Sequence, residues 1–413
     1  MKKEILASLA IVLLGLSSCK NSSNKAPETT ADGDSISTAA SVETEKPNTD
    51  YKPAFAGQTR IAAVQTQTPY QGTILSKDLK KPWGIVGLPD GRLLITEKEG
   101  TMRIATASGT LSDAITGVPK VDDKGQGGLL GLTIDPDFKI NRMIYWVFSE
   151  KLSNGNLTAV AKGKLSADEK RIEGAKVIYR ALPAYDGDKH FGGRIVFDKN
   201  GDLFVSTGER SDLETRPQAQ QLNSALGKIL KITKDGQAAS GNPFVGKADS
   251  KPEIYAYGNR NVQGLALHPT TGELWENEFG PRGGDEVNII QTGKNYGWPT
   301  ITYGIEYKGG VIGDGIQQKE GLEQPVYYWD PVVSASGMTF YTGNGVPEWK
   351  NNLFLACLSS QHIARLVIEN NKVTGEERLL ATEKQRFRDI AQGADGALYA
   401  VTDEGRLYRI DKK

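Results

Sequence analysis

The stretch DGDKHFGGRIVFDKNGDLFVSTGER, residues 186–210, contains one of only three histidines among the 413 residues. Two β-rich runs, residues 194–197 and 203–207, flank the pair Asn200-Gly201, which is a strong signal for a β-hairpin. His190 precedes the hairpin, beside a Gly-Gly pair that lets other groups approach the backbone closely. His190 is therefore either a structural loop histidine or a general base, a role that histidine commonly fills near neutral pH.

One pattern recurs along the body of the chain. A short apolar run leads into a polar, glycine-containing turn and then into a second β-rich run. The six copies begin near residues 83, 129, 193, 262, 337 and 388. Repeats of this kind are typical of β-propellers, and no window shows sustained helical periodicity. The sequence therefore predicts an all-β fold, a six-bladed β-propeller of four-stranded antiparallel blades over residues 58–413, with a pair of β-sandwiches as the alternative.

The charge balance points away from polyanionic partners. Lys and Arg number 50, Asp and Glu number 50, and the formal net charge is zero. A nucleic-acid-binding protein usually carries a basic excess, so we expect no nucleic acid partner.

The first residues resemble a bacterial lipoprotein signal. Lys2 and Lys3 form a basic start, residues 5–16 are apolar but too short for a comfortable membrane span, and LSSC at 16–19 is similar to a lipobox. The resemblance implies that residues 1–18 are removed and that Cys19 is acylated, which would anchor the protein durably in a membrane. A plain secretory peptide is the alternative. Either way we expect export, with a lipid anchor in the bacterial cell envelope facing the periplasm or the surface, most simply at the outer membrane.

The segment after the signal predicts a tether. Residues 19–57 are rich in Ser, Thr, Asn, Asp, Glu and Pro and nearly lack large apolar residues, so we expect them to stay flexible. Only one further cysteine exists, Cys357, within the apolar run LFLACL. We expect it to be a small buried side chain without a disulfide partner.

Polar residues gather just before four of the predicted inner strands. They are Gln126, His190, the cluster Arg260, Asn261 and Gln263, and the pair Arg386 and Arg388. In a propeller these positions converge on one channel mouth. Arginines can cap strands or pair with surface acids, but several at equivalent positions favour a grip on a multiply carboxylated anion.

A second constellation is EFGPRGGDEVN, residues 278–288. Gly280 and Pro281 offer backbone carbonyls at a sharp turn, and Asp285 and Glu286 offer carboxylates shortly after. Hard oxygen ligands of both kinds suit Ca²⁺, although the spacing is not that of an EF-hand. A glycine-rich acidic turn without metal is the alternative.

Several of these motifs resemble the soluble quinoprotein sugar dehydrogenases, the PQQ-dependent glucose and aldose-sugar dehydrogenases of the glucose/sorbosone dehydrogenase family. The similarity covers about residues 75–411. The matching motifs are HFGGR at 190–194, GNRNVQGLA at 258–266, EFGPRGGDEVN at 278–288, NYGWP at 295–299 and RFRD at 386–389. The resemblance implies a six-bladed propeller that binds pyrroloquinoline quinone (PQQ) over its channel.

The resemblance also implies roles for individual residues. His190 would be the general base that takes the proton from the anomeric hydroxyl of an aldose as hydride passes to the quinone. Cofactor contacts would come from Gln126, Arg260, Asn261, Gln263, Arg386 and Arg388. Calcium at the cofactor would bind the carbonyls of Gly280 and Pro281, and a second, structural calcium would fall at Asp285, Glu286 and Tyr296.

The chain departs from the best-known glucose enzyme of this family at three places. Lys189 stands where that enzyme has an aspartate before the base, and Val332 stands where it has a threonine near the cofactor. Ser359 or Ser360 stands where it has a lysine that helps to hold the cofactor. These departures predict weaker binding of PQQ or a different range of sugars. If its ammonium approaches the ring, Lys189 would also lower the pKa of His190 from its reference of about 6.5.

Three functions remain open from the sequence. The first is oxidation of an aldose, with PQQ and Ca²⁺ as cofactors and a quinone or a cytochrome as the electron acceptor. The second is a calcium-dependent hydrolase of the lactonase type, which would need acid and amide side chains around the channel. The third is a non-catalytic, surface-anchored binding propeller.

Overall fold

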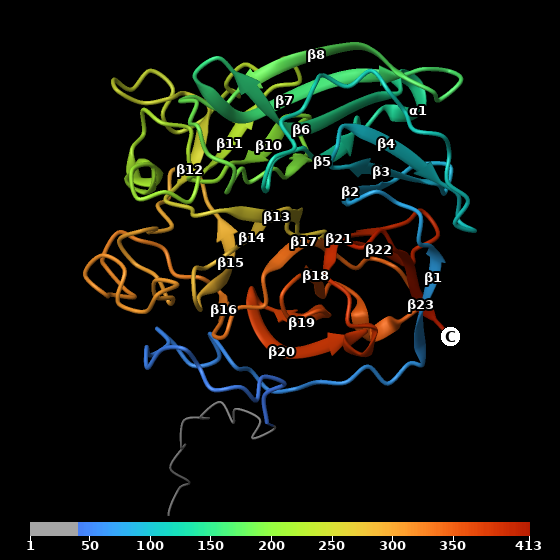
Figure 1. Cartoon of the computed structure of the whole chain (residues 1–413). Helices are drawn as coiled ribbons and strands as arrows, with labels where there is room; N and C mark the ends of the chain where they lie inside the picture. The colour runs from blue at the N-terminus through green and yellow to red at the C-terminus, as the bar shows by residue number, and fades with distance from the viewer. Residues whose placement is uncertain (1–39) are drawn as a thin grey trace, which may run out of the picture. The chain divides into compact units, whose positions relative to one another are not determined.

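The computed structural model describes residues 40–413, which form an almost entirely β structure (Figure 1). Its helical parts are α1 (Phe138–Asn141) and three short 3-10 helices, η1 (Arg216–Gln220), η2 (Pro347–Trp349) and η3 (Ala381–Glu383). The predicted signal peptide, Cys19 and the first half of the predicted tether lie outside the described residues. Within residues 40–413 no helix is long and apolar enough to cross a membrane.

The strands form six antiparallel sheets that follow one another around the molecule, as the colours in Figure 1 show. The first sheet contains β2 (Pro82–Gly87), β3 (Leu93–Glu97) and β4 (Thr101–Ala105). The second contains β5 (Leu129–Ile134), β6 (Met143–Leu152), β7 (Gly155–Leu165) and β8 (Ile172–Arg180). The third contains β9 (Ile195–Phe197), β10 (Leu203–Ser206), β11 (Lys228–Ile232) and β12 (Ile254–Tyr257).

The other three sheets complete the ring. The fourth contains β13 (Val262–Leu267), β14 (Leu274–Glu278), β15 (Asp285–Ile290) and β16 (Tyr327–Trp329). The fifth contains β17 (Ala335–Phe340), β18 (Leu353–Cys357), β19 (Ile363–Glu369) and β20 (Lys372–Leu379). The sixth contains β21 (Phe387–Gln392), β22 (Leu398–Thr402), β23 (Leu407–Lys412) and β1 (Tyr70–Ser76). Because β1 pairs with β23, the start of the propeller closes the last blade and joins the two ends of the ring (Figure 1).

The predicted six-bladed propeller is confirmed. Strands β2, β5, β9, β13, β17 and β21 open the six repeats, and residues of all six line one central cavity of about 270 Å³, so they are the inner strands. The prediction of four strands in each blade is correct for five of the six blades. In the first blade only isolated bridges to β4, from Leu111 and Ile115, stand in for a regular fourth strand.

The hairpin and the buried cysteine also agree with the sequence. Phe197 pairs with Leu203 across the turn that contains Asn200-Gly201, which has a left-handed φ of 85° at Gly201. Cys357 is a free, fully buried residue of β18.

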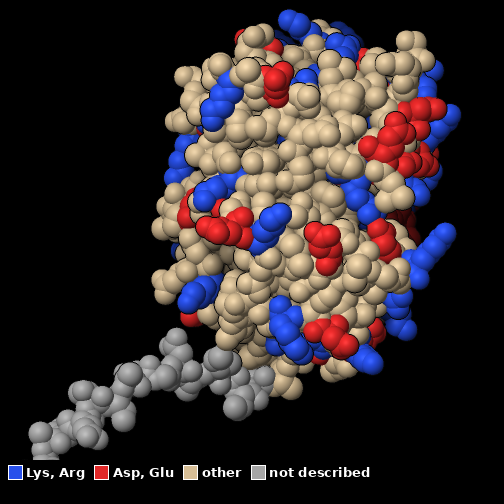
Figure 2. Space-filling model, turned by 90° about the vertical axis from the view of Figure 1, so that its left-hand side faces the viewer, with Lys and Arg blue, Asp and Glu red and all other residues tan. Residues whose placement is uncertain are grey.

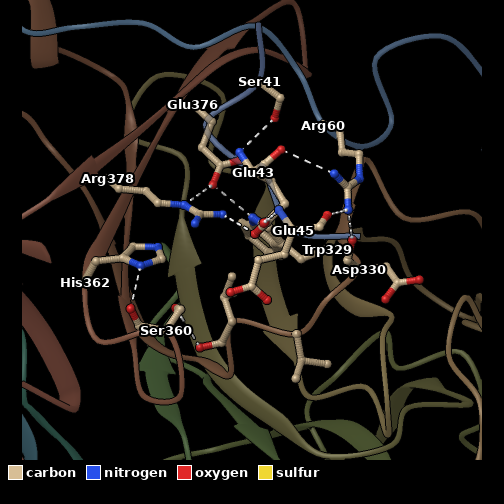
Figure 3. A network of polar contacts seen from close by, with 12 residues as sticks. Ser41, Glu43, Glu45, Arg60, Trp329, Asp330, Ser360, His362, Glu376 and Arg378 are labelled. Atoms are coloured by element: carbon tan, nitrogen blue, oxygen red, sulfur yellow. Dashed lines mark hydrogen bonds and ion pairs between the residues drawn. The ribbon is translucent and has the colours of Figure 1, made fainter. Parts of the chain in front are cut away.

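Residues 40–57 differ from the predicted tether, because polar contacts hold them against the fourth and fifth blades (Figure 3). Glu43 pairs with Arg378 of β20 at 2.6 Å. Both oxygens of Asp330 accept backbone amides, from Asn48 at 2.9 Å and from Thr49 at 3.0 Å. A polar composition shows that a segment cannot form a core, but it does not exclude docking through specific carboxylate partners. The ordered part of the chain therefore begins before residue 58.

Charges of both signs are mixed over the surface of residues 40–413. Figure 2 shows Lys and Arg interspersed with Asp and Glu on the face in view. This pattern fits the zero net charge and shows no broad basic stripe on that face.

A buried ion pair closes the middle of the channel. Arg194, just before β9, lies 2.6 Å from Asp389 of β21, and both side chains are less than a tenth exposed. Asp389 also accepts the amide of Ile85 in β2, and Arg194 donates to the carbonyl of Gln263 in β13. Trp83 packs against the guanidinium at 4.3 Å. One pair thus connects the first, third, fourth and sixth blades.

We expect Arg194→Met to lower the free energy of unfolding by about 3–5 kcal/mol, because it leaves the Asp389 carboxylate buried without its cation. Urea unfolding followed by tryptophan fluorescence measures this change. The matched control is Arg409→Met, which removes a partly exposed pair with Asp395 and should cost about 0–1 kcal/mol. A loss below about 1 kcal/mol for Arg194→Met would show that the central pair is not a stabilising contact.

Candidate active site

A cavity of about 560 Å³ opens at one mouth of the channel. Its wall is cationic and aromatic. The charged lining residues are Lys81, Lys98, Arg386, Arg388 and Asp403, and the aromatic ones are Trp83, Phe191, Phe279 and Tyr307. Of the predicted site residues, Gln126, Gln263, Arg386 and Arg388 line it directly. His190, Arg260 and Asn261 are buried residues that contact the lining residues instead.

His190 lies in a strained, fully enclosed position. Its φ is +48°, in the left-handed region, and the residue is 3% exposed. Gln126 accepts the His190 amide at 2.8 Å, and Glu209 lies 2.6 Å from Nδ1 of the ring. A carboxylate at Nδ1 fixes the tautomer that carries its proton there, which leaves Nε2 as the nitrogen able to accept a proton.

Burial and the positive charge of Arg260 lower the pKa of His190 to about 4, although Glu209 acts in the opposite direction. The condition set for an effect of Lys189 is not met: Lys189 is exposed and is not among the largest causes of the shift in the pKa of His190. The imidazole is therefore neutral over the whole physiological pH range.

In the predicted amide and guanidinium cluster, Asn261 and Gln263 contact each other, whereas the Arg260 side chain contacts the loop after β14 and two aromatic residues. Asn261 Oδ1 accepts the amide of Gly192 at 3.0 Å and Nε2 of Gln263 at 3.3 Å. Arg260 lies 5.2 Å from the centre of the Trp298 ring, and its Nη2 lies 3.2 Å from the Tyr307 hydroxyl. Within residues 40–413, Asn261 Nδ2 and Arg260 Nε are buried donors without a hydrogen-bond partner. Unsatisfied buried donors are costly, which favours a ligand that supplies acceptor atoms here.

Arg386 and Arg388 converge on one carboxylate. Asp403 accepts Nε of both residues, at 2.9 Å each. Burial raises the pKa of Asp403, but the two arginines outweigh it and hold the pKa below its usual value. Each guanidinium has five N–H donors, so both keep donors for an acidic ligand in the cavity.

The residues predicted to bind metal lie between β14 and β15 (Gly280 and Pro281), at the start of β15 (Asp285 and Glu286) and after it (Tyr296), and several have protein partners. The Gly280 carbonyl accepts Nη1 of Arg260 at 2.9 Å. The two Asp285 oxygens accept the amides of Gly280 and Val333, at 2.8 and 2.9 Å, and also that of Ser334. Asp285 therefore ties this turn to the start of the fifth blade. The Tyr296 hydroxyl is likewise bonded to backbone groups of residues 289 and 291.

Glu286 belongs to an acidic face that the sequence reading missed. Across β14 and β15, Glu278 pairs in register with Glu286 and Glu276 pairs with Asn288, so all four side chains share one side of the sheet. Burial raises the pKa of Glu278 to about 7 and also raises those of Glu276 and Glu286. Glu276 Oε2 and Asn288 Oδ1 are buried acceptors without a partner in the described part of the chain. No group of three or more His, Cys, Asp or Glu side chains among residues 40–413 is arranged to hold a metal ion.

The sequence alone did not identify Asp403 and Lys98, which line the cavity, or Glu209, which is buried behind it against His190. The hairpin register brings residue 190 close to residues 209 and 210, because Phe197 pairs with Leu203, but it places Arg210 and not Glu209 opposite His190. Asp403 and Lys98 stand outside the recurring motifs and carry no comparable signal.

Comparisons with known proteins agree with this site. The propeller and its cationic cavity place the chain in the class of propeller sugar dehydrogenases. It belongs to the Glucose / Sorbosone dehydrogenase family, whose model matches residues 79–409. It is 41% identical over 345 residues to "Aldose sugar dehydrogenase YliI" of Escherichia coli, covering 82% of this chain and 92% of that protein.

Two solved structures are similar throughout the propeller. The apo-form crystal structure of the soluble aldose sugar dehydrogenase from Escherichia coli has a TM-score of 0.80 at 40% identity, covering 83% of this chain and 100% of that one. The PQQ-bound aldose sugar dehydrogenase from Streptomyces coelicolor has a TM-score of 0.68 at 27% identity, covering 84% and 99%.

We expect His190 to titrate near pH 4 in the folded protein. NMR of ring-labelled histidine measures this, with His268→Gln and His362→Gln variants for assignment. Because Glu209 raises the pKa of His190, Glu209→Gln should lower it further, whereas Arg260→Met should raise it. The folded pKa is below the unfolded one, so the neutral ring favours folding above about pH 6.5, and this contribution is lost on acidification towards pH 4. Titration of His190 near 6.5 would contradict the buried His190–Glu209 pair.

Proposed function

We propose that the protein is a PQQ-dependent aldose dehydrogenase that oxidises the anomeric carbon of an aldose to the lactone. The observation that carries the proposal is a buried His190–Glu209 pair next to a cavity with four cations and one carboxylate on its wall. The aldose sugar dehydrogenases to which this chain is similar, one of them PQQ-bound, support the same chemistry.

The donor set of the cavity suits PQQ, a planar ring system with several carboxylates. Arg386 and Arg388 have unused N–H donors for carboxylates, and bidentate guanidinium contacts are among the strongest hydrogen bonds available. Trp83 and Phe191 supply aromatic surface. The buried donors Asn261 Nδ2 and Arg260 Nε lack acceptors in the protein. When bound, PQQ supplies the quinone that accepts hydride.

His190 and Glu209 supply the base. The Nδ1 proton of His190 is directed to Glu209, so Nε2 takes the proton of the anomeric hydroxyl as hydride leaves the same carbon. The Glu209 carboxylate then stabilises the imidazolium that forms. A pKa of about 4 makes the ring a weaker base but keeps it unprotonated at neutral pH, so the whole population of molecules is competent.

We include Ca²⁺ in the proposal. The carbonyls of Gly280 and Pro281 are the expected ligands at the cofactor, with the Gly280 oxygen shared with Arg260. The acidic face of Glu276, Glu278 and Glu286 has buried, mutually repelling carboxylates and unpaired oxygens, which a hard cation would neutralise.

The cavity wall argues against the lactonase-type alternative. A calcium hydrolase would need acid and amide side chains around the channel, whereas this wall carries four basic residues and only Asp403 as an acid. A non-catalytic binding propeller has no need of a histidine held in a fixed tautomer.

Reconstitution tests the proposal directly. We expect purified protein with added PQQ and Ca²⁺ to reduce a redox dye when aldoses are supplied, and exhaustive chelation to remove that activity until Ca²⁺ is restored. Isothermal titration measures PQQ binding in parallel. Full activity after chelation would exclude the calcium part, whereas tight PQQ binding without oxidation of any aldose would favour the binding propeller.

The variant His190→Gln tests the role of the base, because it keeps a polar side chain of similar shape and removes the imidazole. Loss of a general base costs about 10²–10⁴-fold in rate, so kcat should fall in that range while PQQ binding is retained. A variant within about threefold of the wild-type kcat would mean that another group takes the proton.

We further propose that the protein is exported and anchored by acylated Cys19, which lies outside the described residues. Cys19→Ala should release the protein from membranes into the soluble fraction of the cell envelope, because the acyl chains supply the anchoring. Fractionation and immunoblotting measure this. A Cys19→Ala protein that still sediments with membranes would refute the lipid anchor.

A further inference from the structure

We propose that Lys98, from the first blade, is a third cationic residue that binds the carboxylates of the cofactor, together with Arg386 and Arg388. This inference rests on the proposed use of PQQ. Lys98 follows β3 directly and lines the same cavity as the two arginines of the sixth blade.

The position of Lys98 is built into the fold. Its ammonium donates to the carbonyls of Asp123 and Gly125, at 2.8 Å each. An ammonium has three donors, so one stays available to a ligand. A Cβ on Gly128 would lie 2.6 Å from Lys98 Cγ, so the bare backbone there makes room for the lysine stem. The two carbonyls belong to the loop that leads to Gln126, whose side chain holds His190.

The charge of Lys98 has no carboxylate partner within residues 40–413. Asp403 is taken by Arg386 and Arg388, and Lys81, the other lysine on the wall, pairs with Glu99 at 3.1 Å. Burial lowers the pKa of Lys98; Asp123 opposes this, while Lys81 and Arg388 lower it further. Like charges gathered without a matching acid are unfavourable, and an anionic ligand would remove that repulsion.

The fifth-blade wall lacks the cation that the family resemblance places there, at Ser359 or Ser360. Ser359 follows Leu358, which lines the cavity and accepts Nη1 of Arg386 at 3.4 Å. The Ser359 hydroxyl is exposed and donates to the Val332 carbonyl. This wall, in the fifth blade, therefore offers no charge, and Lys98 supplies one from the first blade instead.

Isothermal titration with PQQ in the presence of Ca²⁺ tests the inference without any activity measurement. Lys98→Met keeps the length of the stem and removes the charge, so we expect the Kd for PQQ to rise about 10- to 100-fold, as for loss of one charge-assisted contact. Lys98→Arg should stay within about threefold. The control is Lys294→Met, which removes a surface lysine paired with Glu323, and its Kd should equal that of the wild type.

A rescue variant distinguishes two roles of Lys98, direct binding of PQQ and support of the loop of residues 123–125. In the background of Lys98→Met, Ser359→Lys should restore most of the lost affinity, because it places a cation on the fifth-blade wall, where the family resemblance expects one. An unchanged Kd in Lys98→Met, with wild type binding PQQ, would overturn the inference and leave the proposed function standing. Weakened binding that neither Lys98→Arg nor Ser359→Lys repairs would make Lys98 a clamp of the 123–125 loop and overturn it too. No binding of PQQ by the wild type would instead overturn the proposed function.

Discussion

The ion pair between Arg194 and Asp389 is the contact on which the rest of the propeller depends. Inner strands of separate blades meet at a central channel where polar backbone groups and side chains are removed from water, and an unpaired charge there is costly. The pair provides partners for buried polar groups of four blades, because Asp389 also accepts the Ile85 amide and Arg194 also donates to the Gln263 carbonyl. Gln263 and Arg388 line the larger cavity at the channel mouth, while Arg194 and Asp389 line the smaller central cavity. The Arg194–Asp389 pair therefore separates the two cavities.

The site residues lie beside the Arg194–Asp389 pair, and the fold fixes their positions. Each residue just before an inner strand is fixed by the sheet that the strand begins, and the side chains of these residues meet at the mouth of the channel. His190 tolerates a left-handed φ because Gln126 and Glu209 hold its backbone and its ring from two blades. Enclosure lowers the pKa of His190, whereas the cavity wall beside it is cationic. The same site thus keeps a neutral imidazole beside a surface suited to an acidic ligand.

Acids and bases are separated within the molecule although the chain as a whole is neutral. The cavity wall is basic, with Asp403 shared between two arginines, while the face of β14 and β15 concentrates Glu276, Glu278 and Glu286, of which Glu278 is influenced by the charge of Arg260. Burial raises the pKa values of these three glutamates, and repulsion by Glu278 raises those of Glu276 and Glu286 further, so the acidic face favours protonated carboxyls in the absence of a counter-charge. The segment from residue 40 to β1 adds a different kind of restraint, since it crosses the fourth and fifth blades and then completes the sixth (Figure 1).

The sequence by itself determined the architecture and most of the polar residues of the site. Six copies of one hairpin pattern predict six blades, because strand alternation and turn residues are local properties. The register of one hairpin places residue 190 near residues 209 and 210, but it does not select Glu209 as the partner of His190. Only the tertiary structure decided that Arg194 and Asp389 are partners, that Asp403 bridges two arginines, that Lys98 lines the same cavity, and that residues 40–57 dock on the propeller. These contacts join positions up to some 300 residues apart, and a local pattern carries no information on which distant side chain a closed ring brings opposite another.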